Sequence, residues 1–290
     1  MKSILFLSGK GGTGKTSLAG AFAVLAENKV LADCDVDAAN LHLLLGPQVK
    51  SKGIFQGSKL AVKGEGKCIS CGACREVCRF RAIDESFTID PYMCEGCGAC
   101  VYVCPTDAIT LVPQNSGQWT TSATQLGPLA SAELYPGEET SGKLVTIVKQ
   151  KAYELGKESE AELLVIDGSP GIGCPVIASA SGANAVILVT EPSLSGLHDL
   201  KRILGVVQHF RIPAYLVINK ADLNAGISEE IERFADAEDL PTLGQIPYDN
   251  KVTKMMIAGK SAVEDKESPA GKAMQEIFTK FMRKWKREGG

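Results

Sequence analysis

The sequence predicts a doubly wound α/β domain with a mostly parallel sheet, interrupted by a small α+β insert. Five short apolar runs recur along the 290 residues, and helix-forming stretches separate most of them. Strands that alternate with helices in this way are typical of a parallel sheet covered on both faces. This alternation stops between about Leu60 and Pro113, so we expect the insert there; eight of the ten cysteines lie within it, from Cys68 to Cys104.

The apolar runs are expected to be strands buried on both faces, because each is continuous rather than alternating. They are residues 3–8, 30–33, 163–167, 185–190 and 214–219. Helices are expected over residues 17–27, 143–155, 198–209 and 228–237. Residues 114–142 are rich in Gly, Ser and Thr and predict loops or short antiparallel strands.

An apolar stripe at helical spacing marks the end of the chain. It consists of Ala273, Met274, Ile277, Phe278, Phe281, Met282 and Trp285. Basic residues on the opposite side would also suit a helix lying on a membrane surface. We favour a last helix that covers the sheet, since an α/β domain needs one there.

The composition is that of a soluble globular protein, with 44% hydrophobic and 22% charged residues. A formal net charge of −3 gives no reason to expect a nucleic-acid partner. No apolar run approaches the roughly 18 residues that span a bilayer, and the N-terminus lacks the long apolar core of a signal peptide. We therefore expect a cytoplasmic protein without a membrane partner.

A glycine-rich loop follows the first predicted strand and precedes the first predicted helix. Its sequence, GKGGTGKT, fits the phosphate-binding pattern G-x4-G-K-[ST]. Glycines let backbone N–H groups turn toward phosphate oxygens, and the helix N-terminus adds positive potential. Lys15 is expected to neutralise the β- and γ-phosphates, and the Thr16 hydroxyl to ligate Mg²⁺. The nucleotide contacts expected here are Gly9, Lys10, Gly11, Gly12, Thr13, Gly14, Lys15, Thr16 and Ser17.

The cysteine-rich segment contains an internal repeat. The run CISCGACREVC from Cys68 recurs as CEGCGACVYVC from Cys94, at an offset of 26 residues. A repeat of this kind indicates two copies of one small unit. Short, regular cysteine spacings in a chain of this size indicate metal ligation rather than disulfides.

Both cysteine runs resemble the C-x2-C-x2-C-x3-C motif of bacterial ferredoxins, in which each fourth cysteine ligates the other cluster. The resemblance implies two [4Fe–4S] clusters. Their ligands would be Cys68, Cys71, Cys74 and Cys104 for one, and Cys94, Cys97, Cys100 and Cys78 for the other. Zinc is the alternative metal, although zinc sites usually pair C-x2-C units. The first run departs from the motif at Arg79, where the second has Pro105.

The second lysine of the phosphate loop, Lys10, makes it a variant form. The reading K-G-G-x-G-K-[ST] resembles that of the MinD/ParA/Mrp class of P-loop ATPases, to which the nitrogenase iron protein also belongs. In that class the extra lysine reaches the nucleotide of a partner subunit, which implies an ATP-dependent homodimer here. Asp35 matches the class's switch I and would position the attacking water, and Asp167 matches switch II and would hold Mg²⁺. The resemblance thus makes Lys10, Lys15, Asp35 and Asp167 the catalytic residues.

A base-binding segment is expected after the fifth strand. Asn219 and Lys220 begin an N-K-A-D sequence, which coincides with the guanine-reading motif of GTPases. In the MinD-like class the corresponding Asn contacts adenine, and the loop at Pro247 completes the pocket. We favour ATP because the variant phosphate loop is the more specific signal.

Two cysteines lie outside the repeat. By analogy with the nitrogenase iron protein, Cys174 could meet a partner subunit or a cluster in transit. We favour a small buried residue at a helix start for Cys174, and a core position for Cys34. Some Mrp-type carriers have a C-x2-C pair near the C-terminus, and this sequence has none.

The domain prediction is a discontinuous MinD-like ATPase domain, residues 1–59 and 114–290, with a ferredoxin-like insert at 60–113. The favoured function is an ATP-gated protein that passes electrons through its clusters to a protein redox partner. The alternative is an assembly factor or scaffold that delivers a cluster or metallocofactor to a client, with structural clusters of its own. Redox titration with and without ATP distinguishes the two.

Overall fold

The computed structural model describes residues 1–138 and 141–287, which form two compact units. The first unit contains Met1–Lys52, Trp119–Glu133 and the described residues from Ser141 onward. The second contains Gly53–Gln118 and the described residues from Leu134. The second unit is therefore wider than the insert expected at 60–113.

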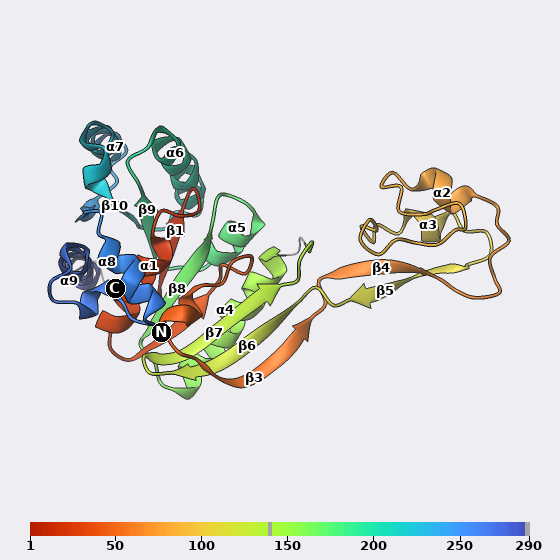
Figure 1. The fold of residues 1–290 in the computed structure, drawn as a ribbon, viewed down its shortest axis with the longest axis horizontal. Helices are drawn as coiled ribbons and strands as arrows, with labels where there is room; N and C mark the ends of the chain where they lie inside the picture. The colour runs from red at the N-terminus through yellow and green to blue at the C-terminus, as the bar shows by residue number, and fades with distance from the viewer. Residues whose placement is uncertain (139–140, 288–290) are drawn as a thin grey trace. The chain divides into compact units, whose positions relative to one another are not determined.

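The large sheet of the described chain has the strand order β11-β10-β9-β1-β8-β2-β7-β6-β3 (Figure 1). The bounds are β1 Lys2–Ser8, β2 Lys29–Asp33, β3 Gln48–Phe55, β6 Gly117–Thr124, β7 Gly127–Leu134, β8 Leu163–Pro170, β9 Ala185–Thr190, β10 Ala214–Asn219 and β11 Thr242–Ile246. The pairs from β11 through to β7 are parallel. The carboxyl ends of β1, β2, β8, β9, β10 and β11 thus meet at one edge, where ligands bind in such sheets.

The five strands predicted from apolar runs are β1, β2, β8, β9 and β10, and the mostly parallel sheet is confirmed. Strands β11 and β3 of this sheet were not predicted from the sequence. The expectation of short strands within residues 114–142 is met by β6 and β7, which a two-residue link joins. Such a link connects antiparallel neighbours.

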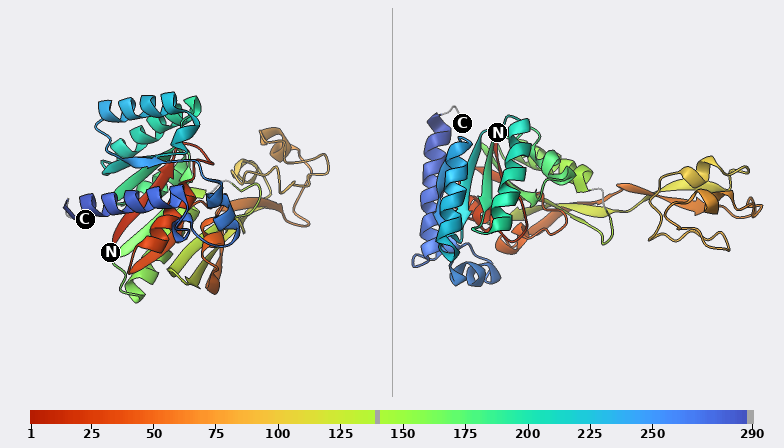
Figure 2. Two further views of the ribbon diagram at one scale, coloured as in Figure 1. Left: turned by 60° about the vertical axis from the view of Figure 1, so that its left-hand side comes forward. Right: turned by 90° about the horizontal axis from the view of Figure 1, so that it is seen from above.

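Helices lie on both faces of this sheet, as a doubly wound fold requires (Figure 2). They are α1 Lys15–Leu25, α4 Ser141–Glu158, α5 Cys174–Ala180, α6 Leu194–His209, α7 Ala225–Ala237, α8 Asn250–Ile257 and α9 Pro269–Arg287, with short 3-10 helices η1 Leu41–Leu44, η2 Ala221–Leu223 and η3 Ala262–Glu264. The β1 residues Ile4 and Phe6 belong to the core under α1 and α9, while Leu5 and Leu7 are also fully buried. Successive residues of a strand face opposite sides of the sheet, and here both sides are buried. The apolar runs in the sequence are therefore continuous.

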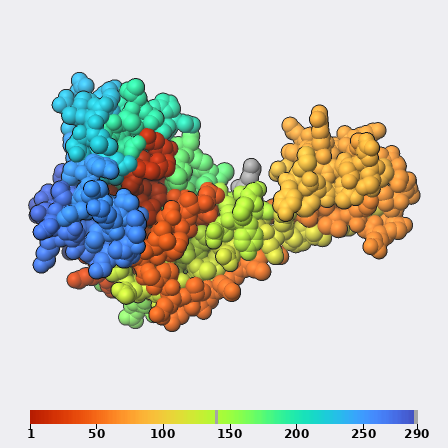
Figure 3. Space-filling model, in the orientation of Figure 1, coloured from red at the N-terminus to blue at the C-terminus, as the bar shows by residue number. Residues whose placement is uncertain are grey.

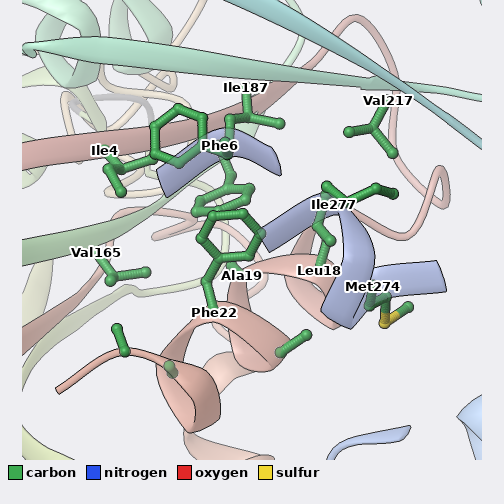
Figure 4. Close-up of a cluster of buried hydrophobic side chains, with 14 of the residues drawn as sticks. Ile4, Phe6, Leu18, Ala19, Phe22, Val165, Ile187, Val217, Met274 and Ile277 are labelled. Carbon is green, nitrogen blue, oxygen red and sulfur yellow. The ribbon is translucent and has the colours of Figure 1, made fainter. Parts of the chain in front are cut away.

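Helix α9 packs its apolar stripe into the core beside the sheet and α1. Met274, Ile277 and Phe281 of its apolar stripe are at most 2% exposed. Figure 4 shows Met274 and Ile277 in the cluster that contains Phe6 and Phe22, whose ring centroids lie 4.9 Å apart. The packing prediction is confirmed. None of the helices in the described residues is long and apolar enough to cross a bilayer.

Within its described residues, the second unit is built on one antiparallel pair of strands and two very short helices. Strands β4 Ser58–Lys63 and β5 Ile109–Gln114 pair antiparallel, and the helices are α2 Ala73–Val77 and α3 Ala99–Tyr102. In the space-filling view its orange and yellow residues form one continuous body (Figure 3). Its small core contains Ala61, Ile83, Cys100 and Ile109, with several cysteines packed against it.

Candidate nucleotide site and cysteine-lined hollows

The glycine-rich loop connects β1 to α1 at the carboxyl edge of the sheet. Gly12 and Gly14 have φ values of 79° and 88°, which only glycine adopts readily. A side chain at Gly14 would also collide with the amide of Asn219. That amide donates from Nδ2 to the backbone oxygen of Thr13 at 2.7 Å. The end of β10 therefore holds the loop in shape.

Lys15, the first residue of α1, is buried between two carboxylates. Its Nζ lies 2.6 Å from Asp167 Oδ1 and 3.5 Å from Asp35 Oδ2. Burial by itself lowers the pKa of Lys15, but the Coulomb attraction of Asp167 and Asp35 outweighs burial and raises that pKa. The structure thus brings together three of the four residues predicted to be catalytic.

Two buried oxygen atoms at this site have no hydrogen-bond partner among the described residues, namely Thr13 Oγ1 and Asp167 Oδ2. A fully buried, unpartnered carboxylate oxygen is costly unless a ligand satisfies it. Thr16, one residue after Lys15, is half-buried. A carboxylate and a hydroxyl are oxygen ligands of the kind that Mg²⁺ prefers, so this donor set fits a magnesium ion.

Asp33, at the end of β2, is hydrogen-bonded to the backbone of the segment that follows it. Its carboxylate accepts hydrogen bonds from the backbone N–H groups of Asp35, at 3.2 Å, and Leu41, at 2.9 Å. Burial, with repulsion by Asp167, raises the pKa of Asp33 to about 8. Burial also raises the pKa of Asp35, to about 6, although Lys15 opposes that shift. Asp33 was not predicted as a site residue, although its position at the end of β2, two residues before Asp35, could have indicated it.

The two predicted switch segments are hydrogen-bonded to each other. Cys34 N donates to Asp167 O, and Ser169 Oγ donates to Cys34 O, both at 2.7 Å. Cys34 is fully buried, which confirms its predicted core position. Cys174 does begin α5, but it is exposed, so its predicted burial is wrong. Val176 and other residues of α5 face the core instead.

The fourth predicted catalytic residue, Lys10, contacts Glu191. Lys10 Nζ is 2.7 Å from Glu191 Oε1, and Lys220 Nζ is 2.9 Å from Glu191 Oε2. Lys220 Nζ also donates to the backbone oxygen of Gly12 at 3.0 Å. Glu191 follows β9 and was missed, because a lone glutamate after a strand carries no specific sequence signal.

The structure also shows the surroundings of other residues that were predicted to contact the nucleotide. Pro247 follows β11 and is half-buried, while the neighbouring Tyr248 N donates to Asp222 Oδ1 at 2.6 Å. Ser17 Oγ contacts Met256 Sδ of α8 at 3.3 Å, so its hydroxyl is directed toward α8. Gly9 is half-buried and Gly11 is exposed.

The second unit contains two separate hollows, each lined by four cysteines. One is lined by Cys68, Cys71, Cys74 and Cys104, and the other by Cys78, Cys94, Cys97 and Cys100. Each hollow therefore takes three cysteines from one repeat and the fourth from the other. The grouping is the one that the ferredoxin motif implies.

The two short helices connect the hollows. Cys74 lies in α2 and Cys78 directly after it, yet the two line different hollows, and Cys100 and Cys104 repeat this arrangement around α3. Backbone hydrogen bonds from Thr106 and Ala108 lower the pKa of Cys104, and Ala108 N lies 3.2 Å from its Sγ. Within the described residues, no three His, Cys, Asp or Glu side chains converge closely enough to hold a single metal ion.

The mostly parallel sheet, the phosphate loop after β1 and Asp167 in the neighbouring strand β8 define a P-loop nucleotide-binding protein. Residues 4–262 match the family model CbiA, the CobQ/CobB/MinD/ParA nucleotide binding domain. The chain belongs to this family.

Three similar proteins illustrate the relationship. MJ0578, an uncharacterized protein of Methanocaldococcus jannaschii, is 35% identical over 282 residues, which cover 96% of this chain and 95% of that protein. An iron-sulfur cluster carrier protein of Pyrococcus abyssi is 27% identical over 162 residues, 51% of this chain and 55% of the carrier. The structure of the septum site-determining protein MinD of Pyrococcus horikoshii, complexed with Mg-ADP, matches with a TM-score of 0.59 and 18% identity, covering 97% of this chain and 95% of that one.

Proposed function

We propose that this protein is an ATP-hydrolysing iron–sulfur protein in which an ATP-dependent homodimer controls electron transfer through two [4Fe–4S] clusters. The observation that carries the proposal is the pair of hollows, each lined by four cysteines, on a chain with a phosphate-binding loop. Each cluster, when bound, would supply one-electron redox chemistry. The proposed domains are the MinD-like residues 1–59 and 114–290 and the ferredoxin-like insert 60–113.

The linings of both hollows suit a cubane. Beside the cysteines they contain the small residues Gly72, Ala73, Gly98 and Ala99 and apolar side chains such as Ile83 and Ile109. Four sulfur ligands that line a hollow, rather than converge on one point, favour a cluster over zinc, which holds all four sulfurs at about 2.3 Å. Cys74 and Cys78 are four residues apart in sequence, as are Cys100 and Cys104, and each pair contributes to both hollows, so the clusters would be neighbours suited to electron transfer.

Mg-ATP is the proposed nucleotide. Lys15 would neutralise the phosphates, Thr16 and Asp167 would hold Mg²⁺, and Asp35 would orient the attacking water. The unpartnered Asp167 Oδ2 supports a metal-linked role. One oxygen of Asp222, the residue that would read guanine in a GTPase, already accepts a hydrogen bond from Tyr248. That contact favours ATP over GTP, with Asn219 and Pro247 beside the adenine.

Anaerobic purification tests the cluster proposal directly. We expect about eight iron and eight sulfide per chain. Cys68→Ser and Cys104→Ser should each leave the same single cluster, recognised by its electron paramagnetic resonance spectrum, and Cys78→Ser should leave the other. The exposed Cys174 outside the hollows provides the control, since Cys174→Ser should retain both clusters. Purified protein without iron would refute the proposal.

Redox titration tests the coupling to ATP. Reduction potentials should differ between ATP-bound and ADP-bound protein, because the two nucleotides contact the switch segments differently. Identical reduction potentials in the two states, with ATP hydrolysis retained, would refute nucleotide control of electron transfer but not the presence of the clusters.

The second candidate function is delivery of a cluster or metallocofactor to a client protein. The similarity to an iron-sulfur cluster carrier protein favours it. Stoichiometric transfer of iron and sulfide to an apo-ferredoxin, faster with ATP, would support delivery. Retention of both clusters through many ATP turnovers would support the redox function.

A further inference from the structure

Glu191 joins two lysines that belong to different parts of the nucleotide site. One carboxylate oxygen contacts Lys10 of the phosphate loop, and the other contacts Lys220 after β10. The Glu191 side chain is only 21% exposed, so solvent screens these contacts less than it would a surface pair.

The ammonium group of Lys10 uses its full donor capacity inside its own chain. Beside Glu191, it lies 3.1 Å from Ser193 Oγ and 2.9 Å from Ser195 Oγ. A lysine ammonium has three protons, and three acceptors are present here. Lys10 therefore cannot donate to a phosphate oxygen without leaving at least one of these partners.

The acceptors are themselves held in place. Ser193 caps α6, because its Oγ accepts from Gly196 N at 3.0 Å. Ser193 N in turn donates to Glu191 O at 2.8 Å. A contact made from fixed acceptors loses little side-chain entropy on the acceptor side, which strengthens it.

We propose that Glu191, together with Ser193 and Ser195, is a positioning site that retains Lys10 within its own chain and opposes ATP-dependent dimerisation. The inference rests on the proposed function, in which Lys10 reaches the nucleotide of a partner subunit. Lys10 must leave Glu191 before it crosses the interface, so this contact raises the nucleotide concentration that dimerisation requires. Lys220 contacts the same Glu191 carboxylate and also the backbone oxygen of Gly12, so the release of Lys10 from Glu191 is coupled to the position of Gly12.

Glu191→Gln tests the proposal by removing the charge while keeping the side-chain size. The dissociation constant of the dimer, measured by analytical ultracentrifugation with a non-hydrolysable ATP analogue and Mg²⁺, should fall about tenfold, as expected for loss of one charge-assisted contact. Ser195→Ala, at an exposed position, should lower it by a smaller factor without affecting Lys220. An unchanged or larger dissociation constant in both variants would overturn the proposal.

A Lys10→Ala background separates this inference from the proposed function. In that background Glu191→Gln should leave the dissociation constant unchanged, because the effect acts through Lys10. A tenfold change that persists without Lys10 would overturn the role of Glu191 in holding it. If Lys10→Ala does not weaken the dimer at all, the dimer role of Lys10 in the proposed function fails too.

Discussion

A buried lysine on α4 provides the sharpest stability prediction. Lys149 is 7% exposed, and its Nζ donates to the backbone oxygens of Ala178, Ser179 and Ser181, at the end of α5. The last carbonyl groups of a helix have no partner within it and carry partial negative charge, so a cation stabilises them. Lys149 thus links the end of α5 to α4.

Lys149→Met should destabilise the first unit by about 2 kcal/mol. Leaving a buried acceptor without a donor costs about 1–3 kcal/mol, and loss of the favourable interaction with the helix terminus adds about 0.3–1 kcal/mol. Burial lowers the pKa of Lys149, which means that the charged form already carries a desolvation cost. Removing the charge recovers part of that cost, while the Met side chain still fills the space of the lysine stem.

Thermal unfolding followed by tryptophan fluorescence measures this effect. Both tryptophans, Trp119 and Trp285, lie in the first unit, so the signal is specific for it. For a unit of this size the midpoint should fall by about 4–8 °C. Lys143→Met, an exposed change on the same helix, is the matched control. Equal midpoints for the two variants would refute the capping role of Lys149.

Three further predictions concern the nucleotide site. Lys15→Gln should weaken Mg-ATP binding at least about 100-fold in calorimetry, because Gln lacks the charge that meets the phosphates; the brown colour expected of the proposed clusters should remain, and its loss would mean that the cysteine-rich unit depends on the loop. Asp35→Ala should retain ATP binding but slow hydrolysis about 100-fold or more in a phosphate-release assay, and unchanged turnover would exclude its assigned role. Gly14→Ala should abolish ATP binding, since the positive φ and the Asn219 amide both reject a side chain; normal binding would show that the loop does not need this geometry.

Part of the fold follows directly from residue patterns. Continuous apolar runs identified β1, β2, β8, β9 and β10 because these strands are buried on both faces. Strand β3 was missed since nearly all of its residues are exposed, which leaves no hydrophobic period to detect. Strand β11 contains Gly244 and Gln245, which interrupt its apolar character.

The sequence likewise predicted some residues of the candidate site and not others. Short-range motifs predicted the phosphate loop and the cysteine repeat, because their chemistry requires fixed local spacing. Asp35 and Asp167 were predicted from the resemblance to the MinD/ParA/Mrp class. Pairs distant in sequence were not accessible: nothing in the sequence linked Lys10 to Glu191, or Lys149 to the end of α5.

What the sequence by itself determined is therefore the local chemistry: a loop that can surround phosphates and two cysteine runs that can bind metal. The tertiary structure decided which of these groups face each other. Parallel strands bring their carboxyl ends to one edge of the sheet, so Lys15 meets Asp167 across 152 positions of sequence. The low solvent exposure at that edge determines how strong the interactions between charged groups are. Burial strengthens each contact between opposite charges and raises the free-energy cost of leaving a charge unpaired.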